Sequence, residues 1–217
     1  SFGGRHLAVA STDLKLPSYY INRELSQLEF CRRVLFMARD GGLPMLERLR
    51  YLSITSGILD EFFEIRVAGL KQQADYGAVQ RDADNLSAEE QLEQVAAAAK
   101  ALVADLYATL NDELLPELKA QKIRLLRSSE WTEAQVNWLK RFFAREVAPI
   151  ISPVGLDPAH PFPEPANKNL AFIVTLEGRD AFGRDSRRAI VQAPRSLPRV
   201  IQLPEDCRDG EECFVLL

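Results

Sequence analysis

The segment from residue 58 to residue 70 decides the fold of the first half of this chain. It reads Ile58-Leu59-Asp60-Glu61-Phe62-Phe63-Glu64-Ile65-Arg66-Val67-Ala68-Gly69-Leu70. Apolar residues recur in it at helical spacing and form a broad stripe, made by Leu59, Phe62, Phe63, Val67 and Leu70 and widened by Ile58 and Ile65. We therefore predict a helix that is buried on most of its sides, which an ordinary amphipathic surface helix is not.

The acidic side chains of this segment need partners if the helix is buried. Asp60 and Glu64 stand four residues apart on one face, and like charges at that spacing destabilise a helix unless a cation or a hydrogen-bond donor meets them. One interpretation is that Asp60, Glu61 and Glu64 ligate a magnesium ion, which prefers carboxylates. The favoured interpretation is an ion network with arginines on neighbouring turns or helices, namely Arg48, Arg50 and Arg66.

Helical patterns also flank this segment on its amino-terminal side. Asn22 suits a helix N-cap, and the apolar spacing after it predicts a first helix that reaches about Asp40, before Gly41-Gly42. Pro44 suits the first position of a second helix. That helix continues into the segment, either directly or after a break at residues 55–57.

A third helix is predicted after a polar loop over residues 75–86. The residues Ser87-Ala88-Glu89-Glu90 form a capping box, in which each of two residues satisfies a backbone N–H of the other. The apolar spacing runs on to about Ala120, with a bend near Pro116 because proline lacks a backbone N–H. The sequence thus predicts an antiparallel helical bundle of three or four helices.

The pattern changes after residue 121. Short runs of β-forming residues predict strands near residues 123–126, 188–193, 199–203 and 213–217, and a buried strand over residues 170–176. A second capping box, Thr132 with Gln135, opens a helix that extends to Val147, and a proline-rich loop covers residues 149–165.

These patterns predict an α+β protein with a helical bundle followed by an incomplete α+β domain. We expect a flexible arm over residues 1–20, a helical domain over 21–121 and a partial domain over 122–217. The chain ends on the apolar run from Cys213 to Leu217, so we expect the native protein to continue.

Composition narrows the classes of protein. The 217 residues carry a net charge of −4, whereas nucleic-acid binders usually carry a basic surplus, so we expect no nucleic acid as partner. The three cysteines lack a CxxC spacing and indicate reduced thiols. No run approaches the roughly 20 apolar residues that span a bilayer. We therefore expect a cytoplasmic protein, with peripheral membrane association left open.

Sequence signatures of self-sufficient active sites are absent: the chain has no GxGxxG, GxxxxGK[ST], HExxH or GxSxG. Its two histidines, His6 and His160, have no neighbouring ligand at metal spacing, and His160 is interpreted as a loop histidine bonded to backbone. An arginine cluster could bind phosphate oxygens, although a solvated turn between two strands is favoured; it consists of Arg179, Arg184, Arg187 and Arg188.

Longer motifs give the chain a resemblance to a known family, the bacterial polyphosphate kinases of the first type. The resemblance covers residues 20 to 217 in order. In the first half, the motifs are residues 21–26 (INRELS), 33–35 (RVL), 44–49 (PMLERL) and 59–70 (LDEFFEIRVAGL), which resemble the amino-terminal domain of that enzyme. In the second half, residues 148–153 (APIISP), 156–163 (LDPAHPFP) and 167–170 (NKNL) resemble the start of its head domain.

The resemblance implies a reversible transfer of the terminal phosphoryl group of ATP to polyphosphate through a phosphohistidine, with Mg²⁺ as cofactor. In the family the nucleophilic histidine lies in carboxy-terminal domains, and neither His6 nor His160 matches it, so no catalytic residue and no metal ligand is assigned here. The implied partners are ATP, polyphosphate and further copies of the chain in a homo-oligomer. We expect these 217 residues to supply a wall of the nucleotide site and dimer contacts, and to be inactive alone.

One binding position follows from the same resemblance. The family commonly has an asparagine directly before Leu-Asp-Glu-Phe, near the nucleotide base, and this position is Ile58 here. Isoleucine can pack against an adenine face but cannot hydrogen-bond its edge. Two other departures are Gln27, where tryptophan is frequent, and Cys31, where asparagine is frequent; we expect both to change packing rather than chemistry. The alternative function is a non-catalytic helical dimerisation module.

Overall fold

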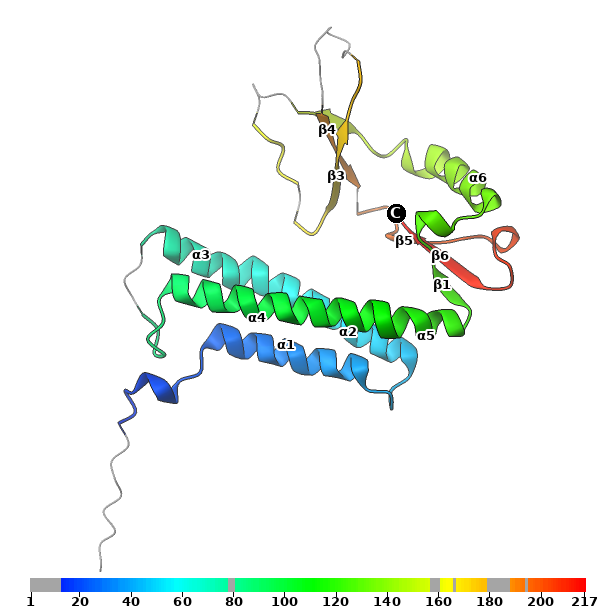
Figure 1. The fold of residues 1–217 in the computed structure, drawn as a ribbon. Helices are drawn as coiled ribbons and strands as arrows, with labels where there is room; N and C mark the ends of the chain where they lie inside the picture. The colour runs from blue at the N-terminus through cyan, green and yellow to red at the C-terminus, as the bar shows by residue number, and fades with distance from the viewer. Residues whose placement is uncertain (1–12, 78–80, 157–160, 166, 179–187, 194) are drawn as a thin grey trace, which may run out of the picture. The chain divides into compact units, whose positions relative to one another are not determined.

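The computed structural model describes residues 13–77, 81–156, 161–165, 167–178, 188–193 and 195–217. The chain divides into two compact units between Leu118 and Lys119, and each unit is described by itself (Figure 1). The first unit is helical and the second combines helices with two small sheets, so the predicted α+β class with an amino-terminal helical bundle is confirmed.

The first helix of the bundle, α1, spans Arg23–Arg39. Its N-cap is Asn22, as predicted, and the Asn22 side chain accepts hydrogen bonds from the backbone N–H groups of Glu24 and Leu25, both at 3.0 Å. After a short turn, Pro44 forms the N-cap of α2 (Met45–Glu61), one residue earlier than the first helical position that we expected. The colour gradient of Figure 1 shows that α1 and α2 run in opposite directions.

The second and third long helices of the bundle each contain a π-helical stretch, whose turns are wider than α-helical turns. The second begins with α2 and the third with α4. Helix α2 passes without a break through residues 55–57, against one of the expected options, and continues through η2 (Phe62–Val67) into α3 (Ala68–Asp75). Helix α4 (Ala88–Ala108) continues through η3 (Thr109–Leu114) into α5 (Leu115–Ala120), so the π stretch lies just before Pro116. The predicted Ser87–Glu90 capping box is confirmed, with bonds of 3.2 and 2.7 Å.

The π stretches explain the spacing of the buried residues. Buried positions along the second long helix follow steps of three or four residues, except for one step of five between Phe62 and Val67. Along the third, the step of five lies between Thr109 and Leu114, again inside the π stretch. Because a π turn holds more residues than an α turn, each stretch returns the next buried side chain to the core face.

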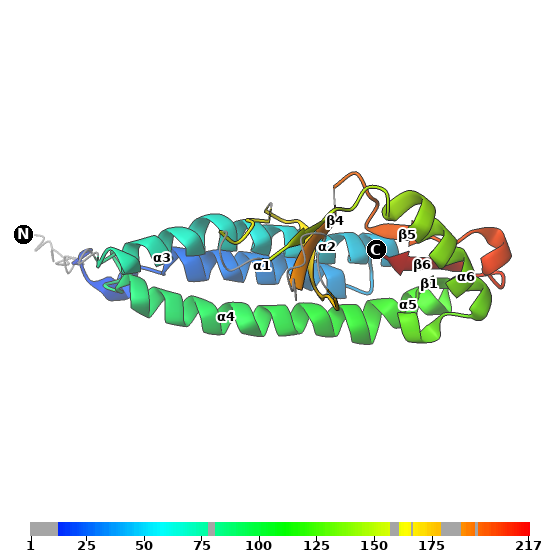
Figure 2. The same cartoon turned by 90° about the horizontal axis from the view of Figure 1, so that it is seen from above.

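The bundle core lies between α1, α2 and α4, which run alongside one another (Figure 2). Its fully buried members include Cys31, Leu35, Leu102 and Leu114. The prediction that residues 58–70 are buried on most sides is wrong. Phe63 is 42% exposed and Ile65 61% exposed, and the acidic residues of the segment are exposed as well, because only one face of this helix meets α1 and α4.

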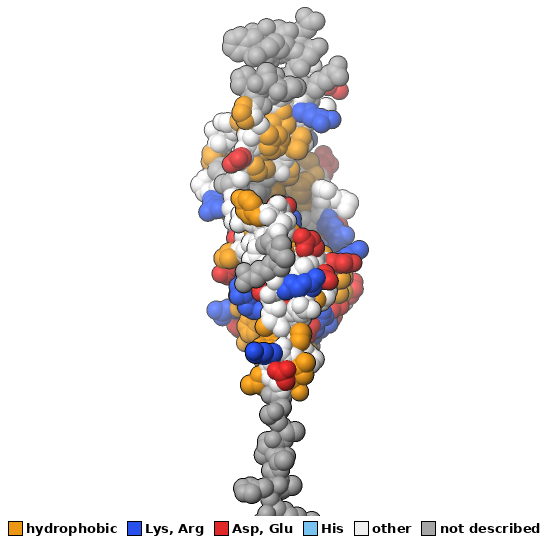
Figure 3. Space-filling model, turned by 90° about the vertical axis from the view of Figure 1, so that its left-hand side faces the viewer, with side chains coloured by type: hydrophobic (Ala, Val, Ile, Leu, Met, Phe, Trp, Pro, Cys, Tyr) orange, Lys and Arg blue, Asp and Glu red, His pale blue; other side chains and the backbone are white. Residues whose placement is uncertain are grey.

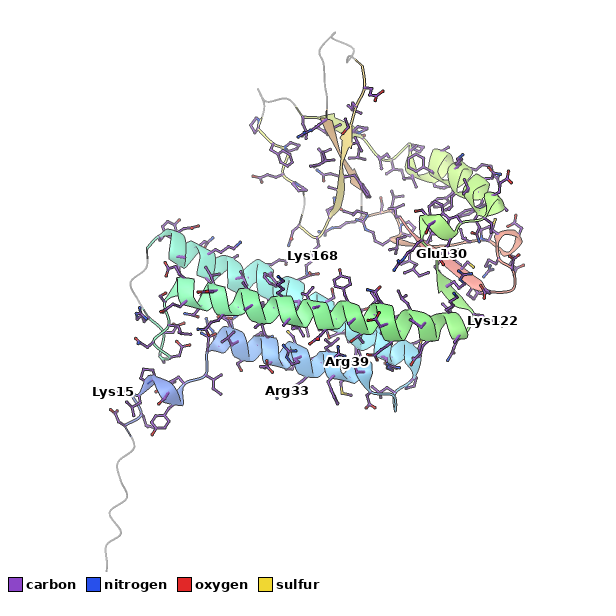
Figure 4. All side chains as sticks on the ribbon, in the orientation of Figure 1. Lys15, Arg33, Arg39, Lys122, Glu130 and Lys168 are labelled. Carbon is purple, nitrogen blue, oxygen red and sulfur yellow. The ribbon has the colours of Figure 1, made fainter. Side chains whose placement is uncertain are left out.

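Ion pairs and hydrogen bonds also connect the helices. The buried Arg48 on α2 donates to both carboxylate oxygens of Glu117 at 2.7 Å, to Glu113 Oε2 at 3.0 Å and to the carbonyl of Ala38 at 2.8 Å. Arg39, labelled in Figure 4 where α1 and α4 run side by side, donates to Thr109 Oγ1 at 2.7 Å. These contacts tie α1 and α2 to η3 and α5.

The second unit contains two three-stranded sheets. In one, β1 (Ile123–Leu125) runs parallel to β6 (Glu212–Leu216), which pairs antiparallel with β5 (Val200–Gln202). The second sheet is antiparallel and has the order β2-β4-β3. Its strands are β2 (Pro153–Gly155), β3 (Leu170–Thr175) and β4 (Arg188–Ala193).

Helix α6 (Glu133–Phe142) opens with the predicted Thr132–Gln135 capping box and continues into the π-helical η5 (Phe143–Val147). Its Trp138, Leu139 and Phe142 pack against a core of Leu203, Val215 and their neighbours from the first sheet. The short 3-10 helices η4 (Ser128–Glu130) and η6 (Glu205–Cys207) complete this part.

The structure also describes the predicted strand over residues 170–176 and part of the expected arm over residues 1–20. The strand predicted over residues 170–176 exists as β3, but it is not buried, since Phe172 is 47% and Ile173 64% exposed. Of the expected arm, residues 1–12 lie outside the described residues. In its remaining part η1 (Pro17–Tyr19) forms a 3-10 turn, and the Tyr20 hydroxyl donates a hydrogen bond to the Leu14 carbonyl at 2.7 Å. Among the helices that the structure describes, none is both long and apolar enough for a membrane span.

Candidate functional site

The residue singled out by the sequence, Ile58, lines a surface pocket of about 190 Å³ on the helical unit. Six side chains line this pocket, which we call the Ile58 pocket. Gln27 comes from α1, Ile58 and Glu61 come from the end of α2, and Phe62, Ile65 and Arg66 come from η2.

Helical spacing explains why five of the six residues meet. Counted from Ile58, the other four residues of this helix follow at three, four, seven and eight positions, and these positions share one helical face. Phe62 is buried at the base of this face, whereas Ile65 and Glu61 are exposed. The pocket therefore combines an apolar floor with polar groups at its margin.

The electrostatics of the pocket depend on a buried residue next to Arg66. The Glu24 side chain is only 3% exposed, and its Oε2 lies 3.7 Å from Nε of Arg66. Its Oε1 accepts hydrogen bonds from Nε and Nη2 of Arg23 at 3.0 and 2.9 Å. Among the described residues no donor is within hydrogen-bonding distance of Glu24 Oε2. Arg66 is thus held at the pocket by a buried carboxylate.

The remaining polar groups of the pocket differ in kind. Gln27 is half-buried, and within the described parts of the chain its side-chain amide makes no hydrogen bond. An amide offers both donors and an acceptor, whereas the Glu61 carboxylate only accepts and the Arg66 guanidinium only donates. The formal charges of Glu61 and Arg66 cancel, so the pocket margin carries no excess of either sign.

The expected ion network of the 58–70 segment takes a different form. The arginines pair with carboxylates outside the segment: Arg48 with Glu113 and Glu117, Arg50 with Glu47 at 3.7 Å, and Arg66 with Glu24. The pairs of Arg48 and Arg66 therefore join helices to one another, whereas the pair of Arg50 with Glu47 lies within α2. Asp60 and Glu64 are exposed to solvent, which removes the need for a buried partner.

The alternative of a magnesium site at Asp60, Glu61 and Glu64 is not supported. Within residues that the structure describes, histidine, cysteine, aspartate and glutamate side chains form no group of three that could hold a metal ion. On the face drawn in Figure 3, acidic and basic side chains are interspersed.

Several predicted candidates lie outside the described residues: His6, His160, Arg179, Arg184 and Arg187. Arg188 is described as the exposed first residue of β4, and its carbonyl accepts a hydrogen bond from the Leu156 N–H at 2.9 Å. The structure therefore gives no arrangement for the predicted arginine cluster as a whole.

The cysteines are free thiols, as predicted, and all three are buried. Burial raises the pKa of Cys31, Cys207 and Cys213 above that of an ordinary thiol, since the charged thiolate is poorly solvated inside the protein. None of them is in the state that makes a good nucleophile at neutral pH.

Comparison with known proteins places the chain in a family. Residues 20–126 match the model of the polyphosphate kinase N-terminal domain, and residues 134–217 match the model of the polyphosphate kinase middle domain. This chain belongs to the polyphosphate kinase family.

Individual relatives agree with this assignment. The polyphosphate kinase of Pseudomonas aeruginosa is 52% identical over 200 residues, which are 92% of this chain and 29% of the relative. That of Pseudomonas putida is 53% identical over 209 residues, covering 96% of this chain and 29% of the relative. This chain therefore spans less than a third of the length of these polyphosphate kinases.

A solved structure supports the fold. The crystal structure of polyphosphate kinase from Porphyromonas gingivalis matches with a TM-score of 0.73 at 26% sequence identity, covering 90% of this chain and 28% of that chain.

The sequence singled out Ile58 but gave no role in a pocket to Gln27, Arg66 or Glu24. Gln27 was expected to affect packing alone, yet it lines the same pocket as Ile58. The role of Glu24 next to Arg66 has no signal in the local sequence, because 42 positions separate the two residues. For Arg66 a signal existed, since it stands eight positions after Ile58 and hence on the same helical face.

Proposed function

We propose that this chain is part of a polyphosphate kinase that reversibly transfers the terminal phosphoryl group of ATP to polyphosphate through a phosphohistidine. The observation that carries the proposal is the match of both halves of the chain to polyphosphate kinase domains. Within that enzyme, the Ile58 pocket forms one wall of the nucleotide site and Ile58 packs against the base.

The chemistry of the pocket suits a base better than a triphosphate. Ile58, Phe62 and Ile65 provide apolar surface for a flat ring. The opposite charges of Glu61 and Arg66 give no net attraction for an anion, and Arg66 is already next to the Glu24 carboxylate. A volume of about 190 Å³ is below the ~300–1,000 Å³ of pockets that enclose whole drug-sized ligands. The pocket therefore serves as a wall for one part of the nucleotide.

The phosphoryl transfer itself requires groups outside this wall. A histidine nitrogen attacks the γ-phosphorus, ADP leaves, and the phosphoryl group then passes to the terminal phosphate of the polyphosphate chain. Mg²⁺ would neutralise charge on the phosphates. The described residues gather no ligand set that fits this ion, so we derive no step through it. This chain contributes positioning of the nucleotide, and the cytoplasm is the compartment we propose for it.

A second candidate function rests on a different observation. Large apolar side chains are exposed on the bundle helices, among them Phe30 and Phe36 on α1 and Tyr107 on α4. Such residues suit a helical module that dimerises without catalysis, and dimer contacts are also part of our first proposal. The two functions therefore differ in catalysis and not in assembly.

The experiment uses the protein encoded by the whole reading frame that contains this chain. Incubation with γ-labelled ATP and Mg²⁺ is expected to give ADP, polyphosphate and an acid-labile, alkali-stable label on a histidine. The 217-residue chain alone is expected to give no polyphosphate. A whole protein that dimerises but forms neither polyphosphate nor labelled histidine would favour the non-catalytic module. Label on His160 would overturn our assignment of the nucleophile to residues outside this chain.

A further inference from the structure

We propose that Gln27 is the residue that reads the hydrogen-bonding edge of the nucleotide base in this chain. The inference rests on the proposed function, because it takes the Ile58 pocket to be the wall against which the base lies. It assigns base specificity to α1, whereas the family resemblance points to the end of α2.

The residues that line the pocket differ in the hydrogen bonds that their side chains can make. Ile58, Phe62 and Ile65 have no hydrogen-bonding groups in their side chains. The edge of adenine presents a donor, the 6-amino group, beside a ring-nitrogen acceptor, and glutamine can bond both at once. Glu61 can satisfy only the donor and Arg66 only the acceptor. Gln27 is the one neutral amide among the residues that line this pocket.

The polar groups of the pocket also differ in whether another residue of the chain already engages them. Arg66 lies 3.7 Å from Glu24 Oε2, an atom that is buried and has no hydrogen-bond donor among the described residues. Moving the guanidinium toward a ligand would remove one of the two arginines that meet this buried carboxylate, which is costly. Within the described structure the Gln27 amide makes no hydrogen bond that a ligand would have to displace. Gln27 is half-buried and lines the same pocket as Ile58.

Gln27 and Ile58 lie on different helices, and the structure places both in one pocket, on helices that contact each other. The pocket therefore combines a neutral amide from α1 with an apolar surface from the helix that bears Ile58.

The test uses the whole protein and two substrates, ATP and purine riboside triphosphate, which lacks the 6-amino group. The unmodified protein should show a KM for the analogue about tenfold above that for ATP, the ratio expected for one hydrogen bond. Gln27→Leu should raise the KM for ATP about tenfold more than the KM for the analogue, because ATP loses both hydrogen bonds to the amide and the analogue loses only the bond to its ring nitrogen. It should leave kcat unchanged, because the lost interactions are made in the ground state as well.

Two variants make the test specific. Gln73→Leu makes the same chemical change at an exposed site on α3 outside the pocket, and it should change neither KM. The double variant Gln27→Leu/Ile58→Asn returns an amide to the pocket from α2, and it should restore the preference for ATP. This rescue is a readout that a purely structural role of Gln27 would not give.

The possible failures are distinguishable. If the unmodified protein makes polyphosphate and Gln27→Leu keeps the same ratio of KM values, the role of Gln27 is overturned and the proposed function stands. The role is also overturned if Gln27→Leu raises both KM values equally. If the unmodified protein makes no polyphosphate, the proposed function fails, and the assignment of Gln27 fails with it.

Discussion

Nε of Arg66 lies 3.7 Å from Oε2 of Glu24, a carboxylate oxygen buried inside the helical bundle. The contact joins α1 to the π-helical stretch η2. Glu24 also stands in the first turn of α1, where a negative charge is favoured by the helix dipole. One buried charge therefore serves two purposes: it stabilises the start of a helix and holds an arginine at the Ile58 pocket.

Replacing Glu24 with glutamine should lower the free energy of unfolding by about 1.5–3 kcal/mol, because charge-assisted hydrogen bonds to Arg23 are lost at a buried site. Urea denaturation of the 217-residue chain measures the change. Glu29→Gln is the matched control on the same helix, since Glu29 is exposed and its 3.4 Å pair with Arg32 is worth less than about 1 kcal/mol. Equal effects of the two substitutions would contradict the role of Glu24.

The Arg48 network leads to a second prediction. Glu113→Gln with Glu117→Gln should destabilise the helical unit by about 3 kcal/mol or more, because the buried Arg48 guanidinium loses both of its carboxylate partners. Each single substitution should cost less than half of that, since the other glutamate still meets Arg48. The free energies of unfolding of the four forms give a double-mutant cycle, and strictly additive effects would show that the two glutamates do not share Arg48.

The element types followed from local signals in the sequence. Asn22 and the two capping boxes marked helix starts correctly, because a cap depends on residues three positions apart or fewer. Burial was harder to predict. Phe63 was assigned to the core but is exposed. In the π stretch η2 the buried residue Phe62 is followed in the core by Val67, five positions later, and Phe63 lies off this core face.

Contacts between distant segments could not be predicted at all. The partners of Arg48 lie 65 and 69 positions away, and nothing in the segment around it distinguishes Glu113 or Glu117 from nearer carboxylates. The candidate site shows the same limit. The family pattern pointed to Ile58, but the position of Gln27 beside it depends on how α1 packs against α2.

A third prediction concerns acid. The Ser87 backbone N–H, which donates to the Glu90 carboxylate at 2.7 Å, holds the pKa of Glu90 below its ordinary value. Because its pKa is lowered in the folded state, the Glu90 carboxylate stabilises the fold at pH values above its unfolded-state pKa. This stabilisation is lost as the pH falls through the folded-state pKa of Glu90. The urea midpoint of the unmodified chain should therefore fall between neutral pH and a pH below the ordinary glutamate range. In Glu90→Gln this fall in the urea midpoint should be smaller.

The cause of this pKa can be tested directly by an NMR titration of Glu90. Ser87→Ala keeps the backbone N–H and should leave the pKa low. Ser87→Pro removes the N–H and should raise the pKa toward its ordinary value. If both variants shift the pKa equally, the backbone hydrogen bond is not its main cause.

Lys122 provides a fourth prediction, after the end of α5. It has φ = 62°, a left-handed conformation that costs a residue with a Cβ atom about 1–2 kcal/mol. Lys122→Gly should raise the free energy of unfolding by about 1 kcal/mol, because glycine adopts this conformation without the steric penalty. Lys119→Gly, inside the last turn of α5, should lower it by a similar amount. A destabilising Lys122→Gly would indicate that the side chain matters more than the backbone conformation.

The π-helical stretch η2 absorbs one extra residue in the helix that bears Ile58. Removing one residue between Phe62 and Val67 would shorten their step from five residues to four, which is an ordinary α-helical step. Leu59, Phe62, Val67 and Leu70 could then still face the core together in an unbroken α-helix. The same deletion outside the π stretch would rotate one part of the helix by about 100° against the other, so this helix tolerates the loss of a residue at η2 and at few other places.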